Sequence, residues 1–569
     1  MNGAAVAEPV GPPVRRFADL LIIGPDPAPH EAGCGECAER WALDVRPQAV
    51  PAAGARSAAL LQQLTARLRS LPLPSGHAMV LDTSDGSSSV HNITPHSECS
   101  RCAPLIRASV PARWDLRSPQ PPLAGGLRTR ALDGQSLRDE LVDWRFGPIA
   151  HLYRDEESPF PLMTAEAIAP GFAHREGGYG RAGSFAASEV PALLEGVERV
   201  LGGHRQPSAR TVRASWEALG DQALDPRSLA DHTPETYERA DSPFRRFDPT
   251  EEMDWVEGWW LSHDQPVLVP AQLVYWHENA GTDALLYESS NGCAVGGSIE
   301  EAALHGYFEI VERDAFLLTW YGRLRLREID ISGESALADT LLRVERDGLR
   351  LRVLDATSDL GIPVAIAIVT APDELVRAGR APAFSLAAGA HPSGDRAIAA
   401  AIEECVTNAL MYPKWVTMRE SVRVDHYRPM LHDHELVHVL EDHTGMHGLP
   451  EARELWGFLD DPSGRLSLDE FLARGRPAPE DVTGELRHHV DVAARVGVTV
   501  LAVDQSTPHL RDVGVFAVKV IAPGTMPMTF GHLNRRIDNV PRLARAASII
   551  HGAVPAGTWG ETPPPHPFP

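Results

Sequence analysis

The stretch that decides the fold runs from Ser289-Ser-Asn-Gly-Cys-Ala-Val-Gly-Gly-Ser298 through Ile299-Glu-Glu-Ala302 to Glu309-Ile-Val-Glu-Arg-Asp314. A glycine-rich approach leads into a helical pattern that spans residues 299–321. On a helix, the side chains of Glu301, Glu309 and Glu312 fall within about 80° of arc, so they share one face. Like charges on one face repel each other unless a hard cation such as Mg²⁺ binds them. The segment therefore predicts a helix with an acidic, cation-binding face.

An earlier stretch repeats the pattern. Glu195-Gly-Val-Glu198-Arg199 echoes Glu309 to Arg313, and it too follows a glycine-rich segment, 177–180, which we expect to be a turn. Together the two stretches offer carboxylates for Mg²⁺ and two arginines, Arg199 and Arg313, for phosphate oxygens. The competing interpretation is two solvated helical faces with ordinary Glu–Arg pairs.

Length and composition narrow the class of protein. The chain has 569 residues, which predicts two or three domains, and 43% of them are hydrophobic, as in a soluble globular protein. With 53 Lys+Arg against 77 Asp+Glu, the formal net charge is −24, which excludes a general nucleic-acid binder or a basic membrane-surface protein. The first residues lack a basic region followed by an apolar core, and the longest apolar runs are too short for a membrane span. We therefore expect a cytoplasmic protein.

The pairing of the cysteines indicates a metal site. Cys34 and Cys37 form one Cys-x-x-Cys pair, and Cys99 and Cys102 form a second. In a reducing compartment, two such pairs suit tetrahedral binding of a structural Zn²⁺. Two unrelated redox or free-thiol pairs are the alternative.

The remaining pattern predicts a mixed α+β or α/β chain with three parts. These are a small zinc-binding domain at 1–113, a linker at 114–140, and a sheet-and-helix catalytic domain at 141–569. We expect strands at 19–24, 267–275, 350–354, 364–369, 498–503 and 515–521, and helices at 60–71, 190–201, 299–321 and 396–411. The proline-rich end, 562–569, should be extended.

Two further motifs have weaker support. Gly178-x-Gly180-x-x-Gly183 matches a dinucleotide-binding loop, but no convincing strand precedes it. His434-Glu435-Leu-Val-His438 matches the HExxH of zinc proteases. It lies in a locally histidine-rich stretch, where a solvated polar helix is the plainer interpretation.

Five motifs in order make residues 141–569 resemble the YcaO family. They are Glu195–Arg199, the segment from Ser289 to Asp314, Ala401-Ile-Glu-Glu404-Cys405, the segment from Val518 to Gly531, and the terminal Pro565-His-Pro567-Phe-Pro569. The last resembles the P-x-P-x-P end of azoline-forming members, the D-type components of thiazole- and oxazole-modified peptide biosynthesis. The N-terminal residues are similar to an E1-like, zinc-knuckle remnant.

The resemblance implies an ATP- and Mg²⁺-dependent cyclodehydratase. Such enzymes convert Cys, and in some cases Ser or Thr, of a ribosomally made precursor peptide into thiazolines or oxazolines, a route to peptide antibiotics. It implies that Mg²⁺–ATP is bound by Glu195, Glu198, Arg199, Glu301, Glu309, Glu312, Arg313 and Glu404. It also implies that Pro565, Pro567 and Pro569 carry the terminal carboxylate into the site as a general base.

The resemblance has further consequences for partners and alternatives. It implies a separate E1-like (ThiF-like) protein that binds the precursor's leader, a flavin-dependent azoline dehydrogenase, and a homodimer. Ala192, Gly297 and Thr407 stand where many members carry Ser, Asn and Gln, and Ser188, Ser298 and Asn408 are neighbours that could replace them. The alternatives are a non-catalytic precursor-binding scaffold, thioamidation or amidine formation, and, remotely, an HExxH metalloprotease.

Overall fold

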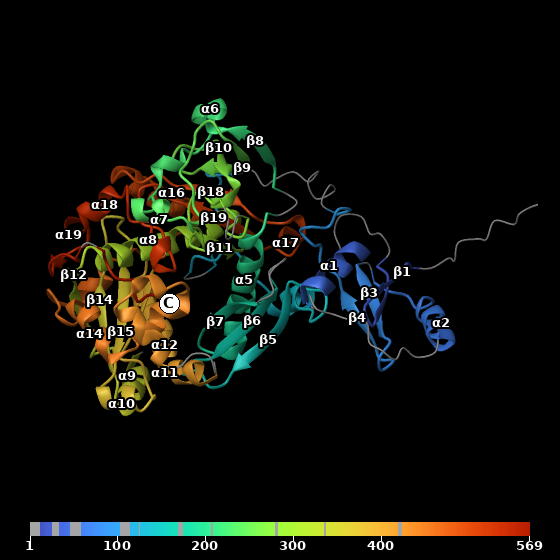
Figure 1. Cartoon of the computed structure of the whole chain (residues 1–569), viewed down its shortest axis with the longest axis horizontal. Coiled ribbons are helices and arrows are strands. Elements are labelled where there is room, and N and C mark those ends of the chain that lie inside the picture. The colour runs from blue at the N-terminus through green and yellow to red at the C-terminus, as the bar shows by residue number, and fades with distance from the viewer. Residues whose placement is uncertain are drawn as a thin grey trace, which may run out of the picture.

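A small N-terminal body and a much larger body make up the computed structural model of the chain (Figure 1). The structure describes residues 12–25, 33–45, 58–74, 76–102, 114–123, 126–168, 175–205, 209–278, 283–334, 337–418, 424–560 and 562–569. Sheets and helices alternate along the larger body, which confirms the predicted mixed sheet-and-helix class.

The small body is an antiparallel sheet with helices beside it. The sheet has the order β1-β2-β3-β4, and α1 brings the first pair of cysteines close to the second. Its elements are β1 Val14–Phe17, β2 Leu20–Ile23, α1 Gly35–Val45, α2 Ala58–Leu68, β3 His77–Asp82 and β4 Ser88–Asn92. The predicted strand at 19–24 and helix at 60–71 are therefore confirmed as β2 and α2.

The larger body contains three principal sheets. The first, β5-β6-β7, has the strands Ile149–Asp155, Leu162–Ile168 and Arg175–Arg181. The second, β10-β9-β18-β19-β11 with β8 beside β9, has the strands Gln265–Pro270, Glu252–Trp260, Leu501–Asp504, Phe516–Ile521, Cys293–Gly296 and Thr211–Ser215. The third, β16-β15-β14-β13-β17, has the strands Phe384–Ala390, Val364–Thr370, Arg350–Asp355, Arg327–Asp330 and Gly464–Ser467. A short pair, β12 Leu324–Arg325 and β20 Val554–Pro555, completes the strands in the described residues.

Three long helices fill the spaces between these sheets. Helix α5 (Phe185–Gly203) packs on β7 and β6 and also touches β11. Helix α8 (Ile299–Tyr321) packs on β19 and β11 on one side and on β16 and β15 on the other. Helix α11 (Gly394–Met418) covers β16 and β15. Because α8 meets sheets on two sides, most of its residues are buried, including the charged Glu300, Glu301 and Asp314.

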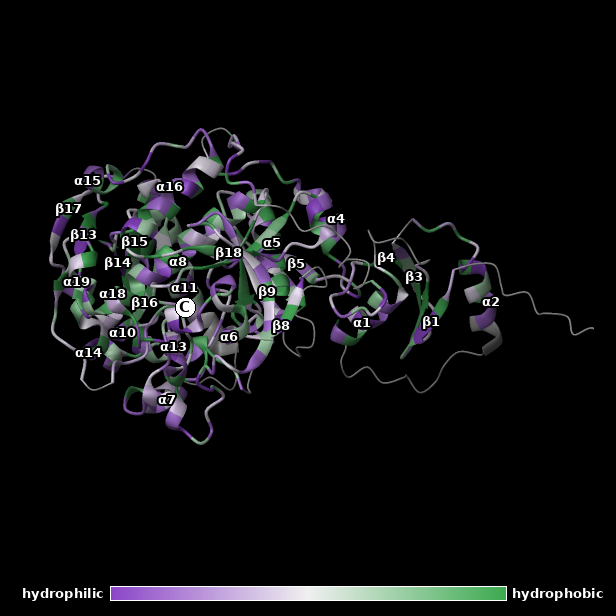
Figure 2. Ribbon diagram, turned by 90° about the horizontal axis from the view of Figure 1, so that it is seen from above, coloured by the Kyte–Doolittle hydropathy of each residue, from purple (hydrophilic) through white to green (hydrophobic). Residues whose placement is uncertain are grey.

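The remaining helices are shorter and lie mostly on the outside of the larger body. The longer ones are α4 Gly134–Leu141, α9 Ala338–Arg346, α13 Leu440–His447 and α16 Val482–Arg495. Those of four or five residues are α6 Trp216–Leu219, α7 Pro234–Glu238, α10 Asp373–Arg377, α12 Val424–Tyr427, α14 Arg453–Trp456, α15 Leu468–Leu472, α17 Pro508–Asp512, α18 Pro541–Ala544 and α19 Ala546–Ile549. Apolar colour concentrates on inner strands such as β18, whereas the outlying α4 is largely hydrophilic (Figure 2).

The glycine-rich approach before α5 is a strand and not the predicted turn. A Cβ at Gly178 would stand 2.3 Å from the backbone nitrogen of Gly196, and one at Gly180 would stand 1.9 Å from the carbonyl of Ser188. The glycines therefore let β7 pack directly on α5, which no larger residue would allow. The G-x-G-x-x-G match lies largely within this strand, so it does not form a phosphate-binding loop.

One predicted strand needs adjustment, and the stretch expected to be a linker contains buried residues. The strand expected at 267–275 is β10, which ends at Pro270, after which Ala271–Leu273 form a 3₁₀ turn. In the stretch expected to be a linker, Leu116 and Leu127 are buried in the main core, and α4 occupies the end of it. Most of this stretch therefore lies against the larger body because its leucines need burial.

Candidate functional site

The two echoed motifs have the same geometry. On α5, Arg199 Nη2 lies 2.9 Å from Glu195 Oε1, and Arg199 Nη1 lies 3.6 Å from Glu198 Oε1. On α8, Arg313 Nε lies 3.8 Å from Glu309 Oε1, and Arg313 Nη1 lies 3.6 Å from Glu312 Oε1. In each helix one guanidinium therefore bridges the carboxylates one position and four positions before it, which is what the i,i+4 spacing of a helix allows.

These helices face each other across one cavity of about 710 Å³, a size typical of small-ligand sites. Its wall contains six of the residues predicted to bind nucleotide, namely Glu195, Glu198, Arg199, Glu309, Arg313 and Glu404. Glu404 comes from α11, so the three long helices each contribute a carboxylate. Elements far apart in the sequence thus place the predicted acidic residues together.

Glu301 and Glu312 lie behind this wall. Glu301 is buried and accepts hydrogen bonds from Arg128 Nη1 at 2.9 Å, from the Thr129 backbone N–H at 2.6 Å and from the Thr129 hydroxyl at 2.7 Å. Glu312 accepts a hydrogen bond from the backbone N–H of Ala390 at 3.1 Å. Arg128 reaches the cavity itself, so Glu301 orients a residue of the wall.

The electrostatics of the cluster are those of crowded negative charge. Burial raises the pKa of Glu198 and of Glu309, and it raises the pKa of Glu312 to about 8, with Glu404 contributing repulsion. Burial opposes the charge of Arg199, yet Glu195 and Glu198 hold its pKa above the ordinary value. The two guanidiniums therefore neutralise the carboxylates only in part, and a cationic ligand would be attracted here.

The proline-rich end of the chain enters this cavity. The C-terminus lies inside the larger body in both views (Figures 1 and 2), and Pro567 and Pro569 line the cavity wall. The buried ring of Phe568 lies 4.0 Å from the Arg313 guanidinium. Pro565 is buried before the cavity, and its carbonyl accepts a hydrogen bond from His447. The structure thus brings two of the three predicted tail prolines to the acidic residues.

A family model decides the identity of the fold. The model described as YcaO cyclodehydratase, ATP- and Mg²⁺-binding, matches residues 179–526, more than half of the chain. The chain belongs to the YcaO family. A sequence relative of this YcaO protein is an uncharacterized protein of Methanothermobacter thermautotrophicus, 27% identical over 348 residues, which are 59% of this chain and 78% of that protein.

Solved structures show the same fold. A heterocyclase in complex with substrate and cofactor superposes with a TM-score of 0.70 at 22% identity, over 97% of this chain and 77% of that one. The heterocyclase TruD superposes with a TM-score of 0.63 at 20% identity, over 96% of this chain and 75% of that one. These likenesses extend over both bodies of the chain.

The cavity also contains residues that the sequence did not reveal as site residues. They include Arg128, Tyr179, Arg181, Ser290 and His305. The backbone N–H of Tyr179 donates to Glu195 at 3.0 Å, and burial lowers the pKa of His305 to about 3. Tyr179 and Ser290 belong to the glycine-rich approaches, which gave a signal, whereas Arg128 comes from the stretch expected to be a linker.

The departures from the usual YcaO motifs have local reasons. Ala192 is fully buried where Gly178 and Gly180 of β7 approach α5, so a larger side chain has no room there. The neighbouring Ser188 does not replace a missing hydroxyl at the site, because its hydroxyl donates to the carbonyls of Pro161 and Ser184.

The other two departures differ from each other. A Cβ at Gly297 would stand 2.6 Å from the side chain of Arg130, and the neighbouring Ser298 caps the N-terminus of α8. Thr407 lines the cavity and its hydroxyl donates to the carbonyl of Glu403. Asn408 lines the same wall, so it is the neighbour that can supply an amide there.

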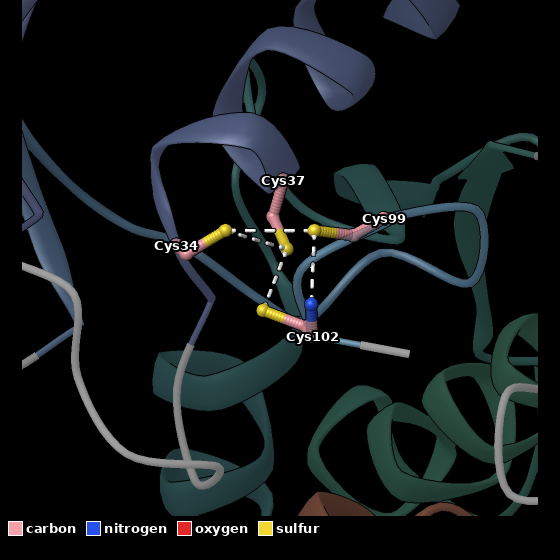
Figure 3. A group of neighbouring side chains, drawn as sticks. All are labelled: Cys34, Cys37, Cys99 and Cys102. Atoms are coloured by element: carbon pink, nitrogen blue, oxygen red, sulfur yellow. Dashed lines mark hydrogen bonds between the residues drawn. The ribbon is translucent and has the colours of Figure 1, made fainter. Parts of the chain in front are cut away.

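The four predicted cysteine ligands form one buried cluster whose sulfurs point toward one another (Figure 3). The Sγ–Sγ distances are 3.5 Å for Cys34–Cys99, 3.6 Å for Cys37–Cys102 and 3.8 Å for Cys34–Cys37. Sulfurs that surround Zn²⁺ tetrahedrally at about 2.3 Å stand about 3.8 Å apart, so the donor set fits this ion. Hydrogen bonds among the thiols lower the pKa of Cys34, and the bonds to Cys102 and Cys37 lower that of Cys99 to about 7, whereas the pKa of Cys37 and of Cys102 is raised.

The HExxH motif does not form a metal site. His434–Leu436 is a single 3₁₀ turn and the chain is extended at Val437, so His434 and His438 do not share a helical face. Glu435 pairs with Arg239 at 2.8 Å. Within the described ranges, only the four cysteines gather three or more ligand atoms within 4.8 Å of one another, which contradicts the metalloprotease interpretation. No described helix is long and apolar enough to cross a membrane.

Proposed function

We propose that this YcaO protein is an ATP-dependent cyclodehydratase that forms thiazolines from cysteines of a ribosomally made precursor peptide. The single observation that carries the proposal is the shared cavity of the two Glu–Glu–Arg groups and the tail. The two Glu–Glu–Arg groups alone would suit any ATP-dependent reaction, so they do not distinguish one YcaO reaction from another. The placement of Pro567 and Pro569 among the proposed phosphate-binding residues favours azoline formation over thioamidation or amidine formation.

The proposed reaction follows from the chemistry of an amide. The cysteine thiol attacks the preceding carbonyl carbon, and the oxygen of the resulting tetrahedral adduct attacks the γ-phosphorus of ATP, which releases ADP. Loss of phosphate and of the amide proton then leaves the C=N bond of the ring. The peptide loses one water in total. An amide oxygen is a poor leaving group, and phosphorylation turns it into a good one, so most of the enzyme's work is orientation and charge stabilisation.

The residues divide this work by charge. We assign the binding of Mg²⁺–ATP to Glu195, Glu198, Glu309, Glu312 and Glu404, with Arg199 and Arg313 toward phosphate oxygens. Bound Mg²⁺ would supply the positive charge that the crowded carboxylates and the phosphates both need. Since three ligand atoms do not converge within 4.8 Å in this part of the described chain, phosphates and water would complete the shell, as Mg²⁺ prefers. Glu301 would act through Arg128, which it holds at 2.9 Å.

The tail would move the protons. In the proposal the carboxylate of Pro569 accepts a proton from the thiol or the amide. Pro565 and Pro567 keep the tail extended and so determine how far that carboxylate extends into the cavity. Pro569 and Pro567 line the cavity beside Arg313, which supports this assignment.

The small body and the partners complete the proposal. The four-cysteine cluster would hold a structural Zn²⁺, because four thiolates leave no open position for catalysis. A separate E1-like partner would bind the leader and present the core peptide. A flavin-dependent dehydrogenase would oxidise the azolines in a later step, and the enzyme would work as a homodimer.

Intact mass spectrometry tests the proposal. A cysteine-rich precursor is incubated with the protein, its leader-binding partner, Mg²⁺ and ATP, beside a variant truncated before Pro565. We expect one water lost per modified residue, only with ATP and only with the full tail. An unchanged mass with intact precursor binding would instead establish a scaffold.

A further inference from the structure

Two histidines that follow the HExxH motif, His443 and His447, bind the proline-rich tail. His443 and His447 are four residues apart on α13, so both face the same side of that helix. That side meets the tail. The His447 Nε2 atom lies 2.9 Å from the carbonyl oxygen of Pro565, and the His443 Nδ1 atom lies 2.7 Å from the carbonyl oxygen of His566.

Together with a tryptophan, these histidines bind three consecutive carbonyls of the tail. The indole N–H of Trp320 on α8 donates to the carbonyl of Pro564 at 3.0 Å. Proline has no backbone N–H, so a proline-rich segment offers mainly its carbonyls to a protein that must hold it. Each of these carbonyls meets one side-chain donor, and this fixes the position of the tail along its own direction.

The hydrogen bonds specify which tautomer each histidine adopts. His443 must carry its proton on Nδ1, because its Nε2 accepts a hydrogen bond from the backbone N–H of Gly531 at 2.9 Å. His447 donates through Nε2, so its one proton in the neutral form is on that nitrogen. Both rings are buried, and burial lowers the pKa of His443 to about 4 and that of His447 to about 3. Neutral imidazoles can thus hold the carbonyls at neutral pH.

A second set of contacts holds the tail nearer the cavity, at Phe568. The ring centre of Phe568 lies 4.0 Å from the Arg313 guanidinium and 4.8 Å from the centre of the Phe316 ring. Arg313 is also the centre of the second Glu–Glu–Arg group. An extended, proline-rich chain advances about 3 Å per residue, so a slip of one residue would withdraw Pro569 from the cavity wall.

We propose that His443 and His447 are positioning residues that set the register of the tail and thereby place Pro567 and Pro569 in the cavity. The inference concerns how the tail is held, and its link to turnover rests on the proposed function. Neither histidine lines the cavity, so both would act through the tail.

The test reads the tail directly and turnover separately. 4-Fluorophenylalanine is placed at position 568, and its ¹⁹F NMR signal is compared with that of a free peptide of residues 562–569. We expect a distinct signal in the parent protein and a shift toward the free-peptide value in His447→Leu and His443→Leu. His447→Gln keeps a donor at the Nε2 position, so it should retain the signal of the parent. A matched control is His489→Leu, since His489 is equally buried but bonds Glu485 on its own helix.

Turnover should follow the ¹⁹F signal. For the two leucine variants we expect kcat for ring formation to fall about 10- to 100-fold, with the Kd for Mg²⁺–ATP within about twofold of the parent. His447→Gln should recover most of the loss. If a leucine variant does not fold, Trp320→Phe removes the third donor but keeps an aromatic ring.

Two results would overturn the inference. One is a leucine variant whose ¹⁹F signal stays at the parent value. The other is a leucine variant whose ¹⁹F signal moves to the free-peptide value while its kcat for ring formation stays at the parent value. A parent protein that holds the tail but modifies no peptide would instead refute the proposed function and leave the inference standing.

Discussion

Replacing Glu312 by glutamine should stabilise the protein without nucleotide and weaken its binding of Mg²⁺–ATP. Burial raises the pKa of this carboxyl from 4.5 to about 8. Since the folded protein then binds the proton more tightly than the unfolded chain does, folding stability falls as pH rises from 4.5 to about 8. At pH 7 the difference corresponds to about 3 kcal/mol, and an uncharged glutamine removes most of it. Glutamine Oε1 can still accept the hydrogen bond from Ala390.

The assay is thermal unfolding across pH, with and without Mg²⁺–ATP. We expect the Tm of Glu312→Gln to rise by a few degrees at pH 7 without nucleotide, and its pH dependence between 5 and 8 to flatten. Glutamine cannot release a proton to become a carboxylate when the cation binds, so Mg²⁺–ATP binding should weaken about 10- to 100-fold and the nucleotide should raise the Tm less than in the parent.

A matched control is Glu300→Gln on the same helix. Burial raises the pKa of Glu300 as well, but its side chain pairs with Gln120, away from the cavity wall. This variant should change stability but leave Mg²⁺–ATP affinity unchanged. A Glu312→Gln protein that is less stable without nucleotide, or that binds Mg²⁺–ATP like the parent, would refute the reasoning.

Three further predictions follow from single contacts. Gly180→Ala should lower the free energy of unfolding by about 3 kcal/mol in urea titrations, because its Cβ would stand 1.9 Å from the carbonyl of Ser188; unchanged stability would show that β7 can move away. Cys37→Ser should lose zinc by elemental analysis and destabilise the small body, whereas Cys405→Ser, buried elsewhere, should keep it; equal zinc in both variants would remove the cluster as the site. The pKa of His443 is lowered to about 4 in the folded protein, so its contribution to folding stability is complete above pH 6.5 and is lost as pH falls toward 4. His443→Asn should therefore make the urea midpoint of unfolding less dependent on pH between 6.5 and 4, and an unchanged pH dependence would contradict the assignment.

Sequence reasoning found the acidic residues of the cavity because their pattern is local. The spacing of Glu195, Glu198 and Arg199, and its echo at Glu309, follows from helical periodicity, which depends only on neighbours in the chain. The order of the sheets and the mutual placement of α5, α8 and α11 were not predicted, because they depend on contacts between elements far apart in the chain. The roles of these residues in nucleotide binding stay predictions, as do the domain boundaries.

What the sequence did not show depends on long-range contacts. The strand β7 was predicted as a turn because it is rich in glycine, a residue common in turns. Its glycines are instead needed because α5 packs directly on them, which the sequence does not reveal. The histidine-rich stretch drew attention to His434 and His438, whereas the useful pair is His443 and His447, whose partners lie more than a hundred residues away in the chain. The same is true of Arg128, whose partner Glu301 is distant in sequence.

The most direct test of the central claim follows the oxygen atom of the amide. A precursor with ¹⁸O in the carbonyl that precedes one cysteine is incubated with the protein, its leader-binding partner and Mg²⁺–ATP, and the released phosphate is analysed by mass spectrometry. The account predicts one ¹⁸O in phosphate for each ring that forms at the labelled position. Ring formation that leaves the ¹⁸O in water, or ATP hydrolysis with unlabelled phosphate and no ring, would contradict it.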